Sequence, residues 1–217
     1  MLSFSPRALI FDMDGLLVDS EPLWHRVERE FAAARGGEFT EAMALACTGQ
    51  GIGNTIRFMG ERLGFPVDVE RDIVEIVDRF IEHVGGLVLK PGAQEILDEV
   101  RGKTRMALAS SSPRRLIDAV LARFVIRDHF EVAVSGQEVA RAKPWPDVFL
   151  RTAELLGEAP AHCVVFEDSL NGARAARAAN MKVIAVPEGD PTGRGFEEVA
   201  DVVVRDLFEA RALVKLG

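Results

Sequence analysis

The chain has 217 residues and a formal net charge of −8, because 34 aspartate and glutamate residues outweigh 26 lysine and arginine residues. This acidic balance argues against nucleic acid as a partner, since phosphate backbones bind to basic surfaces. Hydrophobic residues make up 48% of the chain, enough for a packed core. We find no apolar run that could span a bilayer and no signal peptide, so we expect a cytoplasmic protein without a membrane partner.

The first expected element is a buried strand, "ALIF" at 8–11, which is followed at once by Asp12 and Asp14. Two carboxylates at the end of a buried strand repel each other and lose contact with water. Such a pair needs a bound cation or another positive partner. We therefore take Asp12 and Asp14 as the first candidate functional residues.

The next region, 20–84, shows helical spacing of its apolar residues instead of short runs. We expect four helices here, the first capped by Ser20 and ended by Gly36. Two of the others are shorter and lie near 40–48 and 54–63. The pattern predicts a helical module that is inserted after the first strand.

From about residue 86 onward, short apolar runs alternate with helical patterns. The runs do not alternate polar with apolar residues, which is typical of buried parallel strands; they are 105–112, 131–136, 163–169, 182–186 and 201–204. Helices are expected between them, near 114–123, 146–157 and 171–179. This order predicts an α/β fold with a doubly wound parallel sheet. We expect a core domain of residues 1–15 and 86–217 and a helical cap domain of residues 16–85.

Reactive side chains follow several of the expected strands. Ser110, Ser111 and Ser112 end the second strand, Lys143 lies after the third, and Glu167, Asp168 and Ser169 end the fourth. Because ligands bind beyond the carboxyl ends of such strands, these residues are expected to converge with the two aspartates. A site made only of carboxylate oxygens is suited to bind a hard divalent cation, above all Mg²⁺. The lysine and the serine hydroxyls are suited to bind the oxygens of a phosphoryl group.

The chemistry of these groups indicates phosphoryl transfer. One carboxylate could attack phosphorus and form an aspartyl-phosphate. A second carboxylate two residues further on could protonate the leaving oxygen and later activate water. A small phosphorylated metabolite is the expected partner. The sequence does not determine the oligomeric state, and a monomer is the expectation.

Four segments, "DMDGLLVDSEPLW", "ALASSS", "RAKPWPDVF" and "FEDSLNGARAA", together resemble the four motifs of the haloacid dehalogenase superfamily, in order and across nearly the whole chain. The helical insert is similar to the mobile cap of that superfamily. The chain resembles its β-phosphoglucomutase-like branch, nearest the phosphatases of 2-deoxyglucose 6-phosphate and hexitol phosphates.

The resemblance implies a role for each candidate residue. It implies Asp12 as nucleophile and Asp14 as general acid and base. It implies that Ser110, the Ser111 backbone N–H and Lys143 bind phosphate. Finally, it implies a Mg²⁺ site made of Asp12, the Asp14 backbone carbonyl and Asp168. Glu167 would either bind the ion directly or orient the groups that bind it.

Four alternative functions remain at this point. A sugar-phosphate mutase of the same branch would carry a histidine at the position of Trp24 and an arginine near Ile52, and both are absent. A 2-haloacid dehalogenase would lack Asp14. A phospho-accepting receiver domain is shorter and has no helical insert after the first strand, and an inactive scaffold would not need every motif residue.

Substrate selectivity is expected in the helical module, around Trp24, Gln50 and Asn54. The hinges of the module are expected near 15–19 and 85–91, where glycine can absorb backbone rotation. The sequence leaves open whether Trp24 faces substrate or packs in the module, and whether Arg114 or Arg115 touches a distal phosphate. It does not name the substrate.

Overall fold

The computed structural model describes residues 6–47, 51–187 and 194–214. The chain forms two compact units. We call Met1–Asp19 with Val88–Gly217 the sheet unit, and Ser20–Leu87 the helical unit. These boundaries lie a few residues from those expected from the sequence.

The sheet unit is built on a six-stranded parallel sheet in the order β3-β2-β1-β4-β5-β6. Its strands are β1 (Ala8–Phe11), β2 (Arg105–Ser110), β3 (Val132–Ser135), β4 (Cys163–Glu167), β5 (Lys182–Ala185) and β6 (Val202–Val203). The predicted parallel sheet is thus confirmed. Two strands, β2 and β4, end earlier than expected, because the side chains of their last residues, Ser110 and Glu167, accept hydrogen bonds from backbone N–H groups two residues further on, which leave the ladder.

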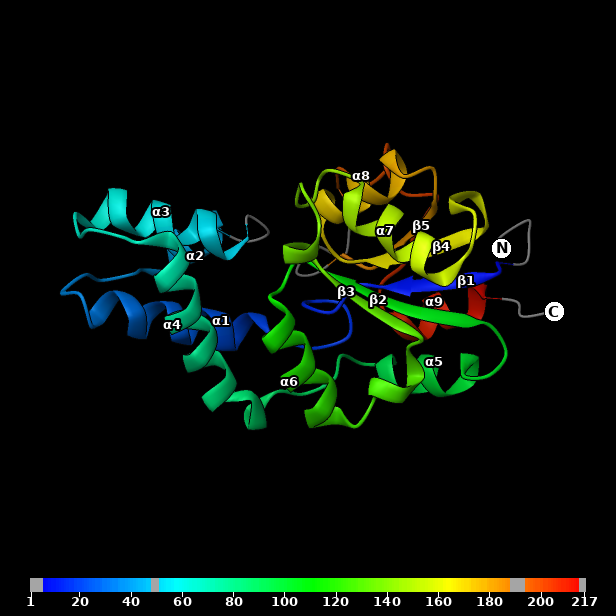
Figure 1. Cartoon of the computed structure of the whole chain (residues 1–217), viewed down its shortest axis with the longest axis horizontal. Helices are drawn as coiled ribbons and strands as arrows, with labels where there is room; N and C mark the ends of the chain where they lie inside the picture. The colour runs from blue at the N-terminus through cyan, green and yellow to red at the C-terminus, as the bar shows by residue number, and fades with distance from the viewer. Residues whose placement is uncertain (1–5, 48–50, 188–193, 215–217) are drawn as a thin grey trace. The chain divides into compact units, whose positions relative to one another are not determined.

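Helices cover both faces of this sheet: α7 and α8 lie on one face, and α5, α6 and α9 on the other (Figure 1). Their bounds are α5 (Ala93–Val100), α6 (Arg114–Phe124), α7 (Asp147–Leu156), α8 (Leu170–Ala178) and α9 (Leu207–Leu213). Short 3₁₀ turns are η2 (Arg127–His129), η3 (Gly136–Glu138) and η4 (Pro160–His162). Gly157 ends α7 in the left-handed conformation, with φ 68°, as expected for a glycine after the last turn.

Both faces of the central strands are buried, and this explains their unbroken apolar sequences. Ile10 and Val165 belong to the core under α7 and α8, and Leu9 and Phe11 are equally inaccessible. The buried alanines of α8 carry so little side chain that the helix packs close to the sheet.

The strand order places β1 in the middle of the sheet, between β2 and β4. Phe11 lies opposite Phe166 in the parallel register, and their rings stack with centroids 4.6 Å apart. The residues that follow, Asp12 and Glu167, therefore leave the sheet at the same level. The chain reverses its winding direction at β1, and such a switch point is where ligands bind in open α/β sheets.

The helical unit contains α1 (Glu21–Ala33), α2 (Glu41–Cys47), α3 (Ile52–Leu63), α4 (Val69–Glu82) and the turn η1 (Val84–Gly86). Phe31, Ile56, Met59 and Phe80 are fully buried in its core. The expected cap by Ser20 is wrong: its side chain makes no capping hydrogen bond, because its backbone is already helical (φ −97°, ψ −18°).

The two chain passages that join the units lie side by side. Asp19 N–H donates to Val88 O at 3.0 Å, and Lys90 N–H donates to Leu17 O at 2.9 Å. Both passages fall within the segments expected as hinges. The chain segments that lead into and out of the helical unit are therefore hydrogen-bonded to each other.

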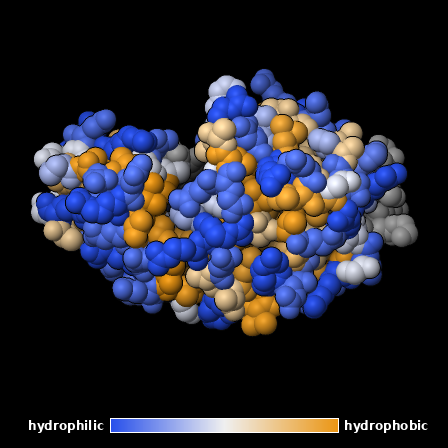
Figure 2. Space-filling view, in the orientation of Figure 1, coloured by the Kyte–Doolittle hydropathy of each residue, from blue (hydrophilic) through white to orange (hydrophobic). Residues whose placement is uncertain are grey.

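The surface is rich in charged residues, and hydrophilic side chains cover much of the visible face of each unit, with apolar patches between them (Figure 2). Among the residues that the structure describes, no helix is both long and apolar enough to cross a membrane.

Candidate active site

The first part of the candidate site is the turn after β1. Asp12 is 6% exposed and Asp14 is partly buried. The chain then turns tightly, because Gly15 has a φ of 80° and its N–H donates to Val18 O at 2.9 Å. This turn keeps both aspartates at the carboxyl end of the sheet.

Lys143 lies between the two strand ends. Its Nζ donates to Asp12 Oδ1 at 2.6 Å, to Glu167 Oε1 at 2.5 Å and to the Ala109 carbonyl at 3.1 Å. The Lys143 side chain is only 6% exposed. All three ammonium donors are therefore used inside the protein, and the lysine is held in one place.

The electrostatics of this cluster favour a further cation. Burial raises the pKa of Asp12, which Lys143 opposes, while the neighbouring carboxylates of Glu167 and Asp14 raise it further. Burial alone would lower the pKa of Lys143, but the attraction of Asp12 and Glu167 outweighs it and raises that pKa. One ammonium thus pairs with the carboxylates of Asp12 and Glu167, and Asp14 adds a third negative charge near Asp12, so negative charge remains in excess.

Glu167 is held at both oxygens. Oε1 accepts from Lys143, and Oε2 accepts from the N–H of Ser169 at 3.1 Å and from its hydroxyl at 3.0 Å. Its carboxylate lies against the start of α8, where a Cβ on Gly172 would come within 1.8 Å of Oε1. Only glycine fits at this position, so Gly172 and Ser169 define where the Glu167 carboxylate sits.

The two carboxylate oxygens of Asp12 differ in their hydrogen bonds. Oδ1 takes the hydrogen bond from Lys143, whereas Oδ2 accepts none from the residues that the structure describes. A buried carboxylate with one such oxygen is suited to attack an electrophile or to bind a cation.

Two serines at the end of β2 and just after it contact Asp14. Ser110 and Ser112 donate their hydroxyls to Asp14 Oδ2 at 3.3 and 2.7 Å. The Ser112 N–H in turn donates to Ser110 Oγ at 3.0 Å. Ser111 is exposed at the same turn. The structure therefore brings the hydroxyls of Ser110 and Ser112 to one carboxylate oxygen of Asp14.

The oxygen donors at this edge fit a hard cation in chemical type. Asp12 and Glu167 sit at the ends of adjacent strands, and the partly buried Asp168 follows directly. The residues that the structure describes contain no cluster of three such side chains arranged to hold a metal. Both Glu167 oxygens already accept hydrogen bonds, whereas Asp12 Oδ2 accepts none from the described residues and could ligate an added cation.

The expected selectivity residues lie in the helical unit. Trp24 is partly buried and packs on Phe80, with ring centroids 4.4 Å apart. Asn54 is exposed and accepts a hydrogen bond from Arg57 at 3.0 Å. Gln50 lies outside the described residues.

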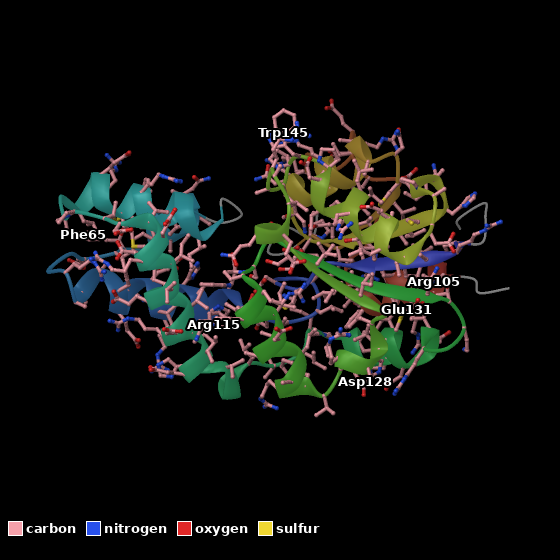
Figure 3. The ribbon with its side chains drawn as sticks, in the orientation of Figure 1. Phe65, Arg105, Arg115, Asp128, Glu131 and Trp145 are labelled. Atoms are coloured by element: carbon pink, nitrogen blue, oxygen red, sulfur yellow. The ribbon has the colours of Figure 1, made fainter. Side chains whose placement is uncertain are left out.

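The two arginines at the start of α6 differ in their partners. Arg114 pairs with Glu138 at 2.6 Å and with Asp118 at 3.7 Å. It also donates to the Ala133 carbonyl. Arg115 is exposed on the same helix (Figure 3). Arg114 is thus committed to structural contacts.

Ser112 and Ser169 were expected at strand ends but without individual roles, and Gly172 was not among the candidate residues. All three stand inside the motifs, so the signal was present in the run of three serines and in "EDSLNG". Their roles depend on contacts with residues far away in the chain, which spacing alone does not show.

The opposite end of the sheet carries a different kind of charged contact. Arg105 and Glu131 point toward one another at the starts of β2 and β3 (Figure 3), with Nη2 and Oε2 2.6 Å apart. Their side chains are 40% and 45% exposed. Solvated pairs of this kind are common structural contacts, so the buried cluster at the carboxyl end is the distinctive one.

This fold and this cluster define an α/β protein with a buried polar site at the switch point of a doubly wound parallel sheet. The family model of the haloacid dehalogenase-like hydrolases matches residues 6–180. The chain belongs to that family, in its β-phosphoglucomutase-like branch, and it is a phosphatase, as the sequence predicted.

Individual relatives match along almost their whole length. Hexitol phosphatase B of Escherichia coli K12 is 34% identical over 228 residues, covering 97% of this chain and 96% of that protein. The phosphorylated carbohydrates phosphatase of Thermotoga maritima is also 34% identical, covering 97% and 91%. The structure of CbbY from Rhodobacter sphaeroides in complex with phosphate has a TM-score of 0.81 and 28% identity, covering 94% and 96%.

Proposed function

We propose that the protein hydrolyses small phosphomonoesters, namely sugar or polyol phosphates, through an aspartyl-phosphate and with Mg²⁺ as cofactor. The observation that carries the proposal is the buried cluster of Lys143, Asp12 and Glu167 at the switch point of the sheet. The names of the relatives, hexitol phosphatase and phosphorylated carbohydrates phosphatase, support the class of substrate.

In the first step, an Asp12 carboxylate oxygen forms a bond to phosphorus while the ester bond to the sugar oxygen breaks. Asp14 donates its proton to that leaving oxygen. Lys143, the Ser110 hydroxyl and the Ser111 N–H provide the positive charge and donors for the phosphoryl oxygens. The products of this step are a free sugar and phosphorylated Asp12.

In the second step, Asp14 accepts a proton from a water molecule whose oxygen attacks phosphorus. The bond between phosphorus and the Asp12 oxygen breaks, which releases inorganic phosphate and restores the Asp12 carboxylate. Asp14 is left protonated for the next cycle, so atoms and protons balance over the two steps.

A bound Mg²⁺ would offset the excess negative charge and polarise the phosphoryl group. We propose Asp12, the Asp14 backbone carbonyl and Asp168 as its ligands, with Glu167 orienting Lys143 because both Glu167 oxygens are taken. The donor set contains only oxygen, which suits this ion.

We propose that the helical unit acts as a cap that selects substrates. The two chain segments that join it to the sheet unit support a hinged motion. The contact between Trp24 and Phe80 favours a packing role for the tryptophan, so selectivity would depend more on exposed positions of the unit such as Asn54. The mutase alternative is not favoured, since Trp24 and Ile52 replace the residues that mutases carry.

The test is a screen of phosphorylated sugars, polyols and a phosphoprotein with the purified protein in Mg²⁺. We expect turnover of small phosphomonoesters, complete loss in EDTA, recovery with Mg²⁺ and poor recovery with Ca²⁺, whose coordination is looser. Full turnover in EDTA would contradict the Mg²⁺ assignment. Rapid hydrolysis of the folded phosphoprotein would contradict the cap.

A further inference from the structure

Ser112 lies at the centre of a hydrogen-bond network that joins the ends of three strands. Its hydroxyl donates to Asp14 after β1 at 2.7 Å, and its N–H donates to Ser110 Oγ at the end of β2 at 3.0 Å. Its carbonyl accepts from the hydroxyl of Ser135, the last residue of β3, at 2.6 Å. Ser112 itself is 8% exposed. All three of its polar groups are therefore used.

The far side of this loop is held by β3 as well. Ser135 is fully buried, and its oxygen also accepts from the N–H of Gln137 at 3.2 Å. A Cβ on Gly136 would lie 3.1 Å from the Ser111 Cα, so the two backbones touch. The end of β3 thus fixes the position of the backbone at Ser111 and Ser112, next to Asp14.

The two serines that reach Asp14 are not equivalent. Ser110 is 3.3 Å from Asp14 Oδ2 and Ser112 is 2.7 Å away. A hydroxyl has one proton to donate, so Ser110 must give up its long bond to Asp14 if it donates to a phosphoryl oxygen. Ser112 can keep its short bond to Asp14 throughout.

We infer that Ser112 is a positioning residue: it holds the side chain of Asp14 in place for proton transfer, while Ser110 binds the phosphoryl group. This inference rests on the proposed function and extends it. Ser135 acts one step further away, by fixing the Ser112 backbone.

The first test compares kcat and KM for a hexitol phosphate. We expect Ser112→Ala to lower kcat about tenfold or more, the loss typical of a hydrogen bond to a charged group, with KM and inhibition by inorganic phosphate almost unchanged. Ser110→Ala should instead raise KM and weaken inhibition by phosphate. Ser112→Thr, which keeps the hydroxyl, should retain most of kcat and guards against a simple folding defect.

The second test is a double-mutant cycle with Asp14→Asn. If Ser112 acts through Asp14, Ser112→Ala should cost almost nothing further once the carboxylate is gone. Thr104→Val is the matched control, because it removes a hydroxyl at the other end of β2 that bonds Arg7 O at 3.1 Å. It should leave kcat and KM unchanged in both backgrounds.

Each outcome has a distinct meaning. The positioning role is overturned if Ser112→Ala lowers kcat equally in the wild-type and Asp14→Asn backgrounds. It is also overturned if Ser112→Ala raises KM and leaves kcat normal. A Ser112→Ala variant with full activity does so too, and leaves the proposed function intact. A wild-type protein that hydrolyses no phosphomonoester overturns the proposed function and this inference together.

Discussion

Each unit of the protein buries a cluster of ionised side chains, and the two clusters are built differently. In the sheet unit, Lys143 lies between Asp12 and Glu167. In the helical unit, Arg35 lies between Asp72 and Glu75, at 3.0 and 2.8 Å. Both place one cation between two carboxylates, so this arrangement alone does not distinguish an active site from a structural contact.

The difference lies in how many acceptors are satisfied. Asp72 accepts from Arg35 with Oδ1 and from the Asp68 N–H with Oδ2 at 2.9 Å. Glu75 accepts from Arg35 with both oxygens and also from Arg79. In the sheet unit, by contrast, Asp12 Oδ2 has no donor among the described residues. We call the helical-unit cluster, in which all four carboxylate oxygens accept hydrogen bonds, the closed cluster, and the sheet-unit cluster the open cluster. A closed cluster stabilises a fold, whereas the carboxylate with an available oxygen in an open cluster can react.

The pKa directions agree with this contrast. Hydrogen bonds from Arg35 lower the pKa of Glu75 to about 2, because they stabilise the ionised form. Burial raises the pKa of Asp12, because its environment does not compensate the charge in full. Strongly perturbed groups of the second kind mark functional sites more often than those of the first.

The largest expected effect is on catalysis and concerns the open carboxylate. Asp12→Asn should lower kcat at least about 10⁴-fold, because an amide is a poor nucleophile. Asp14→Asn should slow both steps but still allow phosphorylation by a substrate with a good leaving group. Acid-quenched samples should contain phosphoenzyme in the Asp14 variant and none in the Asp12 variant. The reverse pattern would exchange the two roles.

The second prediction removes the cation from each cluster. Lys143→Met should destabilise the protein by about 3 kcal/mol, since it leaves the buried carboxylates of Asp12 and Glu167 without a cation. Arg35→Met should cost less, because Arg71 and Arg79 still pair with Asp72 and Glu75. Activity toward a small aryl phosphate should vanish only in the Lys143 variant. Urea titrations and an aryl phosphatase assay measure the two effects. Retained activity in Lys143→Met would show that the open cluster is structural after all.

A third prediction moves one carboxylate of the open cluster without changing its charge. Gly172→Ala places a Cβ where the Glu167 carboxylate lies. We expect a loss of about 1–3 kcal/mol from overpacking, together with a lower kcat, because Lys143 loses an aligned partner. Gly102→Ala is the control: its φ of 72° makes alanine costly there, but its Cβ would meet nothing within 4 Å, so stability should fall while kcat stays unchanged. Thermal unfolding and steady-state kinetics that match the wild type would refute this positioning of Glu167.

The smallest expected effect is the pH dependence of the closed cluster. Because the pKa of Glu75 is lowered to about 2 from 4.5, the unfolded state binds more protons between these values. Its contribution to stability is therefore present above pH 4.5 and lost as the pH falls toward 2. The side chain is 35% exposed, so the contribution should stay below about 1 kcal/mol. The stability difference between wild type and Glu75→Gln should shrink from pH 6 to pH 3; a constant difference would contradict the assigned pKa.

The sequence by itself determined the chemistry and the order of the elements. Unbroken apolar runs predicted the parallel strands, because strands covered on both faces need no polar residues. Asp12, Asp14, Lys143 and Glu167 stood at predicted strand ends, which share one edge in a parallel sheet. Chain order and residue type were sufficient for these inferences.

Some elements and boundaries were not predictable in this way. The helices α5 and α9 are short and pack on each other, so their stability depends on a partner more than on their own pattern. The junction of the two units also shifted by a few residues, because Gly15 lies in a hydrogen-bonded turn of the sheet unit.

Only the tertiary structure decided which atoms meet. Lys143 reaches Asp12 across 131 positions of the chain, and Ser112 reaches Asp14 across 98. Contacts at this distance depend on strand register, on loop paths and on close approaches such as that of Gly172 to Glu167, which packing sets to within a fraction of an ångström. Residue spacing carries no information at that scale. Only the folded chain therefore shows that Asp12 Oδ2 lacks a donor among the described residues and that Ser112 donates a hydrogen bond to Asp14.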